Sequence, residues 1–475
     1  LPWKGAEDVK KMSPVEASTE YLKHVAQAWQ FKHPEEPLSE AEVVLTVPAS
    51  FDAVARDLTA EAARTAGLSK LTLLEEPQAA FYAWLENAGE DWREQVSKGD
   101  LVLVCDIGGG TTDLTLIEVR EEDGDLELER VAVGNHILLG GDNMDLTLAF
   151  SVSQRLKKEG TKLDSWQFKV LTYGCREAKE KLLGSQDVDE HSITIPGRGS
   201  SLIGGSVKVT VTREEAESVL LDGFFPEVDF GSVPTGKRKV GLTEIGLPYE
   251  TDPAITRHLS GFLGDRRPTA ILFNGGVFQA EGMRQRLLDV TEMWFEEPLK
   301  VLQGTDLDLA VARGAARYGL VKRGHGIRIR GGLSRAYYIG VELAMPAIPG
   351  MEPPIKAVCV APQGMEEGTS LSVPDQEFGL VVGEPVEFPF LAATEKTEDE
   401  VGAIHEDWED DGIESLAAIG ATLELEEESE ASEGRSVPVR LETVATEIGT
   451  LELYCVEKDG PGRWKLEFNV RNEDE

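Results

Sequence analysis

Residues 101–119, LVLVCDIGGGTTDLTLIEV, decide the fold of this chain. An apolar run ends at Asp106, three glycines follow, and a second apolar run begins after Asp113. The pattern predicts a strand, a tight turn and a return strand, because glycine adopts backbone conformations that other residues avoid. Backbone N–H groups in such a turn can approach an anion closely, so we expect a phosphate at the hairpin tip. The glycines are Gly108, Gly109 and Gly110.

Polar side chains surround the predicted turn. Asp106 and Asp113 offer the hard oxygen ligands that suit Mg²⁺ held mainly through water. The hydroxyls of Thr111 and Thr112 are expected to donate to a terminal phosphate. An ordinary glycine hairpin with solvated acids is the alternative, but acids on both sides of the glycines favour the phosphate site.

Composition limits the possible partners. The chain has 475 residues, which predicts two to four domains, and its formal net charge of −39 disfavours nucleic acid and anionic membrane as principal partners. Four cysteines without a CxxC pair indicate neither a disulfide framework nor a zinc site and fit a reducing cytosol. No apolar run of about 18 residues exists, so we expect no transmembrane helix. The chain opens with Leu1 rather than Met, so we expect it to lack its beginning.

Helices and strands alternate through the first two thirds of the sequence. A capping box from Ser13 to Glu16 opens the first predicted helix. The predicted helices cover about 14–30, 52–66, 77–86, 165–184, 213–225, 309–321 and stretches beginning near 142 and 280. Predicted strands cover 42–47, 71–74, 193–211 and 270–273, and a Gly/Pro-rich connection covers 226–253.

After residue 323 the pattern changes to short strands with turn residues, which is typical of a β-sandwich. We therefore expect two domains, 1–323 and 324–475. Within the second, residues 395–433 carry sixteen acidic residues and one lysine, which predicts a mobile loop or an insertion.

Several segments resemble, in order and spacing, the nucleotide-binding domain of the DnaK-type heat shock protein 70 chaperones. They are VPASF (47–51), EEPQAAF (75–81), LGGDNMD (139–145), CREAKEKL (175–182), FNGG (273–276) and DLAVARGAA (308–316). The resemblance covers about residues 13–321. It implies an α/β actin-like (ribonuclease-H-like) ATPase fold with ATP and Mg²⁺ between two lobes. More loosely, the tail resembles the family's peptide-binding β-sandwich.

The resemblance also implies roles for individual residues. The implied catalytic acids are Glu76, Asp106 and Asp113, the last two holding the metal through water. Nucleotide binding is implied for Gly108, Gly109, Gly110, Thr111, Thr112, Gly140, Gly141, Asp142, Lys179, Gly275, Gly276 and Asp308. The implied function is that of a cytoplasmic, ATP-dependent chaperone of unfolded polypeptides, with a J-domain co-chaperone and a nucleotide exchange factor as partners.

The sequence departs from the family in two ways that bear on activity. It contains no strand followed by Asp-x-Gly-Thr-Thr and no later lysine near the γ-phosphate, so the first phosphate loop is missing and we expect weak or absent ATP hydrolysis. Gln279 stands where the family places an arginine that stacks on adenine. Arg176 and Glu180 replace an acid and an arginine in CREAKEKL, which predicts a weaker hold on adenine.

Other interpretations stay open at this point. Lys179, taken alone, fits a solvated helix face equally well. Actin-like filament or cell-shape proteins share the DIGGGTTD hairpin, although the β-rich tail argues against them. A degenerate nucleotide-binding regulator and a sugar or acetate kinase are further alternatives.

Overall fold

The computed structural model describes the chain as two compact units, which we take one at a time. Unit 1 comprises 1–75 and 329–475, and unit 2 comprises 76–328. Within the described ranges, no helix is both long and apolar enough to cross a membrane. Residues 11–468 are described except for 123–124, 136, 185–186, 198–205, 237–248, 304–305, 344–352, 375, 383–384, 395, 397, 417–418, 423–434 and 447–448.

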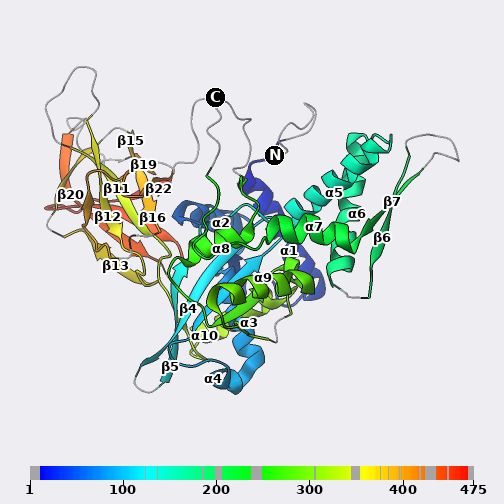
Figure 1. Cartoon of the computed structure of the whole chain (residues 1–475). Helices are drawn as coiled ribbons and strands as arrows, with labels where there is room; N and C mark the ends of the chain where they lie inside the picture. The colour runs from blue at the N-terminus through cyan, green and yellow to red at the C-terminus, as the bar shows by residue number, and fades with distance from the viewer. Residues whose placement is uncertain are drawn as a thin grey trace. The chain divides into compact units, whose positions relative to one another are not determined.

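Unit 2 is organised by a mixed sheet that contains the glycine hairpin (Figure 1). The strands follow the order β5-β4-β3-β8-β9. Strands β3 and β4 pair antiparallel, and β3 and β8 pair parallel, so the hairpin and the segment after β8 meet at one sheet edge. The strand bounds are β3 Leu101–Ile107, β4 Thr112–Glu122, β5 Asp125–Val133, β8 Ala270–Asn274 and β9 Lys300–Val301.

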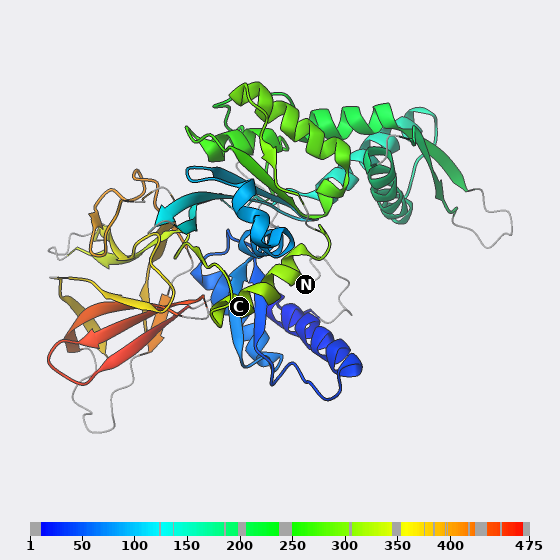
Figure 2. The ribbon, with the colours of Figure 1, turned by 90° about the horizontal axis from the view of Figure 1, so that it is seen from below.

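Helices α5, α6, α7, α8 and α9 bury apolar side chains in one hydrophobic cluster that they share with this sheet. Helices α5 and α6 lie beside the separate β6–β7 hairpin, as both views show (Figures 1 and 2). The helices are α3 Glu76–Ala88, α4 Trp92–Gln95, α5 Gly141–Lys158, α6 Ser165–Gly184, α7 Arg213–Phe224, α8 Ile255–Leu263, α9 Glu281–Phe295 and α10 Ala310–Lys322. The 3₁₀ turns are η1 Gly89–Asp91 and η2 Gly276–Gln279, and the hairpin is β6 Glu190–Ile195 with β7 Val207–Thr212.

The first part of unit 1 is a small α/β layer. Strands β1 Val43–Val47 and β2 Leu71–Glu75 pair in parallel, connected by α2 Ala53–Thr65. The expected capping box is present at the start of α1 Pro14–Lys32, where the Ser13 hydroxyl accepts a hydrogen bond from the Glu16 amide at 3.1 Å.

The second part of unit 1 consists of two antiparallel sheets. One has the order β17-β12-β11-β16-β18, and the other has β13-β20-β21-β22-β19-β15 with β14 also paired to β20. Side chains from both sheets share one hydrophobic cluster, which also includes Ala53 and Val54 of α2. The strands are β11 Ala336–Glu342, β12 Ile355–Ala361, β13 Thr369–Ser372, β14 Phe378–Val382, β15 Pro385–Phe388, β16 Phe390–Ala393, β17 Ile404–His405, β18 Glu414–Ser415, β19 Ile419–Thr422, β20 Arg435–Ala445, β21 Leu451–Glu457 and β22 Arg463–Phe468. The short strand β10 Ile329–Arg330 belongs to neither of these sheets.

The acidic stretch differs from its expected form where it is described. Strands β17 and β18 pair with β12 and β16, so they belong to the sheet and not to a separate loop. His405 fixes this segment because its two ring nitrogens lie 2.7 Å from Asp399 Oδ2 and 2.6 Å from Asp411 Oδ2. The more acidic end, 423–434, lies outside the described residues.

The sequence-based prediction lacked several elements, among them a strand and a helix of unit 2. Strand β5 extends the hairpin by a third antiparallel strand, and helix α8 follows the predicted Gly/Pro-rich connection. Parts of that connection (237–248) and of the predicted strand region 193–211 (198–205) lie outside the described residues. The division at 323/324 stays a prediction, because the contact-based units join residues 1–75 to the β-rich part.

Candidate functional site

The glycine hairpin predicted from the sequence is confirmed. Asp106 and Asp113 are paired opposite each other in β3 and β4, next to the turn. The turn is closed by the Gly108 amide, which donates to Thr111 O at 3.0 Å. The two carboxylates and the glycine turn therefore share one end of the hairpin.

The N-terminus of α5 is fixed against this turn. The amides of Gly141 and Asp142 donate to Gly108 O at 3.0 Å and Gly109 O at 2.7 Å. A Cβ at Gly140 would lie 2.7 Å from Gly108 O, closer than carbon and oxygen can pack, which explains the glycine there. The positive end of the α5 dipole thus lies beside the loop, an arrangement that favours an anion.

Three acids form the electrostatic centre of the site. Burial, then the neighbouring charges of Asp106 and Asp113, raise the pKa of Glu76 to about 7. Burial also raises the pKa of Asp106 to about 6, although Asn274 Nδ2 donates to Asp106 Oδ2 at 2.7 Å. Such mutual repulsion is relieved by a bound cation. Among the residues described, no group of three or more His, Cys, Asp or Glu side chains is arranged to hold a metal ion.

The two predicted threonines differ in their surroundings. Thr112 is fully buried and its hydroxyl donates to Leu139 O at 2.8 Å, so the expectation that it donates to a phosphate disagrees with this geometry. The cause is the strand pleat, which turns adjacent side chains to opposite faces. Thr111 lies in the turn itself, and its contact with a phosphate stays a prediction.

Lys179 of α6 is engaged within the protein. Its Nζ lies 2.6 Å from Asp145 Oδ1 and donates to Gly141 O at 3.2 Å. Arg176, one turn earlier, donates from Nε to Asp145 Oδ2 at 2.7 Å and also pairs with Asp142. Lys179 is therefore not on a solvated face, and α6 is fastened to the first turns of α5.

The turn after β8 completes the site. Gly275 has a φ of 87°, and a Cβ there would lie 2.7 Å from Asp106 Oδ1 and clash with the Ile107 carbonyl. Gly276 begins η2, and at its end Gln279 Nε2 donates to Asp308 Oδ1. Gly275, Gly276 and Asp308 thus belong to the same part of unit 2 as the hairpin.

Sequence reasoning gave no role to Asn274 or Asp145. Asn274 ends strand β8, which pairs in parallel with β3, and it lies opposite Asp106. Its position at the end of a predicted strand was the signal in the sequence that could have marked it as a site residue. Asp145 sits in the quoted LGGDNMD segment, but its two cationic partners come from another helix.

These features define an α/β protein with a glycine hairpin beside a cluster of carboxylates. Comparison with known proteins agrees. The family model described as "Hsp70 protein" matches residues 4–225. The chain belongs to the Hsp70 family as a divergent DnaK-type member, and this membership implies the actin-like ATPase fold.

Curated relatives support the same assignment. The chaperone protein DnaK of Buchnera aphidicola subsp. Schizaphis graminum is 31% identical over 326 residues, covering 67% of this chain and 44% of that protein. DnaK of Psychrobacter cryohalolentis is 30% identical over 322 residues, covering 66% and 43%. DnaK of Stenotrophomonas maltophilia is 28% identical over 328 residues, covering 68% and 44%. The chain spans less than half the length of these relatives.

Proposed function

We propose that the protein is an ATP-dependent molecular chaperone of the Hsp70 type, with ATP and Mg²⁺ bound at the glycine hairpin. The observation that carries the proposal is the cluster of Glu76, Asp106 and Asp113 beside a glycine turn that abuts a helix N-terminus. Family membership disfavours the filament and kinase alternatives.

The residues present fit this ligand. The buried Asn274 Oδ1 has no hydrogen-bond partner, and the negative charges of Asp106 and Asp113 act on the buried carboxyl group of Glu76. We propose that Gly108–Thr111 bind phosphate oxygens, while Asp106 and Asp113 hold the metal through water. Gly140, Gly141, Asp142, Gly275, Gly276 and Asp308 would line the nucleoside end. Bound Mg²⁺ would supply positive charge that offsets both phosphate and carboxylates.

Calorimetry on the full chain tests this assignment. Asp106→Asn and Gly109→Val should each weaken Mg·ATP binding at least tenfold, because one removes a metal-facing charge and the other fills the phosphate cradle. Asp289→Asn, at an exposed acid of α9, is the matched control and should bind as the unaltered chain does. Unchanged affinity in both site variants would refute the assignment.

We propose that the β-rich part of unit 1 is a β-sandwich that binds the polypeptide clients. A cavity of about 840 Å³ opens there between β11, β12, β14 and β20. Its walls include Val341, Phe378 and Leu441, and its lining carries three glutamates, Glu342, Glu377 and Glu387, against one lysine. Apolar walls with an acidic rim suit an extended, basic-apolar polypeptide.

A peptide array on the full chain, at low and high salt, tests the client site. Basic-apolar peptides should bind and weaken as salt rises. Glu342→Lys with Glu387→Lys should lower that binding at least fivefold, whereas Glu414→Lys on β18 should not. Equal binding by both variants would remove this cavity from the proposal.

The remaining assignments follow from the same proposal. We place the nucleotide-binding domain at 1–323 and the client domain at 324–475. The four cysteines are all buried and free, which suits the cytoplasm. A J-domain co-chaperone and an exchange factor are proposed as partners on family grounds alone.

A further inference from the structure

Helix α5 carries a second apolar face that points away from the core of unit 2. Leu146 and Phe150 are 51% and 58% exposed, although the other large apolar side chains of α5 are buried. Gln154 and Lys158 continue the same line at four-residue intervals. Residues four apart share one face of a helix, so these four side chains form a row about 18 Å long, the α5 stripe.

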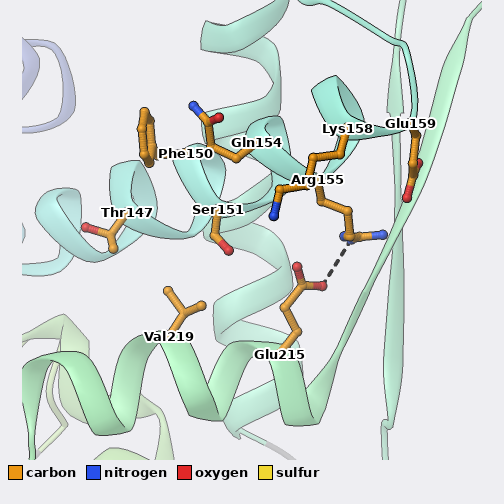
Figure 3. Close-up of a pocket in the computed structure, with 9 residues that line it drawn as sticks. All are labelled: Thr147, Phe150, Ser151, Gln154, Arg155, Lys158, Glu159, Glu215 and Val219. Carbon is orange, nitrogen blue, oxygen red and sulfur yellow. Dashed lines mark hydrogen bonds and ion pairs between the residues drawn. The ribbon is translucent and has the colours of Figure 1, made fainter.

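A hollow of about 700 Å³ adjoins the α5 stripe, between α5 and α7. Figure 3 shows Ser151 of α5 directed toward α7, with Glu215 and Val219 directed back toward it. Arg155 spans the hollow at one end, 3.0 Å from Glu215 and 2.8 Å from Thr210 O. Toward Val219 the facing side chains are small, which leaves room for an inserted apolar side chain.

The two ends of the α5 stripe differ in charge. Its N-terminal end is apolar, whereas Lys157 and Lys158 are exposed at the other end and form no ion pair with the residues that the structure describes. Lysines in the last turn also suit the negative end of the helix dipole, but that does not account for an exposed leucine and phenylalanine. The net charge of −39 repels acidic partners in general, but charges further away than about one Debye length, ~10 Å, are largely screened, so Lys157 and Lys158 attract acidic groups that come close to them.

We infer that the α5 stripe and its hollow are a docking surface for an acidic, amphipathic helix of a partner protein. Apolar side chains of that helix would cover Leu146 and Phe150 and enter the hollow beside Val219. Its carboxylates would contact Lys157 and Lys158. Complementary charge at one end and apolar burial at the other fix the direction of the bound helix. The inference does not depend on the proposed nucleotide or client sites.

Selection from a helix library tests this surface on the full chain. The probe is a stable three-helix scaffold with one helix randomised at its exposed positions, counter-selected against Phe150→Ser/Lys158→Glu. We expect binders enriched in Asp and Glu at one end and in Leu, Ile or Phe at the other. Their Kd should rise at least tenfold with Lys157→Glu/Lys158→Glu and with Leu146→Ser, and should rise with salt.

The control is Tyr173→Ser, which removes an equally exposed aromatic side chain from α6. Unfolding temperatures should match across all variants, since every changed side chain is exposed. Binders without acidic enrichment, equal affinity for the variants, or failure to select any binder would overturn the inference.

Discussion

Asp145 should be the most consequential single carboxylate for the stability of unit 2. The Asp145 side chain is 2% exposed, and it forms ion pairs with both Lys179 and Arg176. The side chain of Lys179 is itself only 8% exposed. Asp145→Asn leaves a buried ammonium without its counter-charge, and breaking a buried pair in this way costs about 3–5 kcal/mol. Lys179→Met should cost less, about 1–2 kcal/mol, because Arg176 still satisfies Asp145.

Urea unfolding of a double-mutant cycle checks this reasoning. The Asp145→Asn/Lys179→Met variant should be about 2 kcal/mol more stable than the sum of the single changes predicts, since the two groups are in direct contact. Asp289→Asn, an exposed acid, provides the baseline. A cost below about 1 kcal/mol for Asp145→Asn, or strict additivity, would show that the pair does not organise α5 and α6.

Three further results are expected. Gly275→Ala should destabilise the chain by about 2–4 kcal/mol in urea unfolding, because the new Cβ meets the Ile107 carbonyl at a positive φ; a neutral effect would contradict the backbone geometry. Burial alone would raise the pKa of Asp252, but two backbone amides, the Arg257 guanidinium and a hydroxyl outweigh it and hold that pKa well below its usual range. The stabilisation is therefore present above about pH 4 and lost as pH falls, and Asp252→Asn should flatten the acid limb of the stability profile. Gln279→Arg should sharpen discrimination between ATP and GTP in competition binding, because a guanidinium can stack on the base; an unaltered chain that already prefers ATP by several hundredfold would exclude this.

Short sequence patterns correctly predicted the elements whose starts or turns depend on residues close together in the chain. The capping box placed the start of α1, and the glycine run placed the β3–β4 hairpin. Helix α8 was not predicted from the sequence. Its N-cap residue, Ala254, has no side chain that can form a capping hydrogen bond, so the sequence carries no signal for the start of a helix there. Strand β5 alternates apolar and charged residues over its first part, a pattern typical of a strand, but the sequence analysis made no prediction for this segment.

The candidate site was predictable in its residues but not in its internal contacts. The glycines at 108–110 and 275–276 are visible in the sequence, and at Gly275 the backbone requires glycine because φ is positive and a Cβ would clash. The neutralisation of Lys179 by Asp145, and the burial of Thr112 against Leu139, depend on how separate elements pack. An ion pair between two helices produces no periodic pattern in the sequence. The sequence was therefore equally consistent with a solvated Lys179 and with a Lys179 that binds a ligand.

Unit 1 is discontinuous in sequence, which has a consequence for biosynthesis. Ala53 and Val54 share a hydrophobic cluster with strands as late as β22. At roughly 5–20 residues per second, a ribosome needs about 7–28 s after completing residue 328 to supply those strands. During that interval the apolar side chains of α2 that pack against the later strands stay exposed to solvent. Unit 2, residues 76–328, is already fully synthesised and can fold. During synthesis the segment around α2 is thus exposed to misfolding for longer than unit 2, and we expect stalling before residue 328 to yield aggregates while stalling after it yields a folded unit 2.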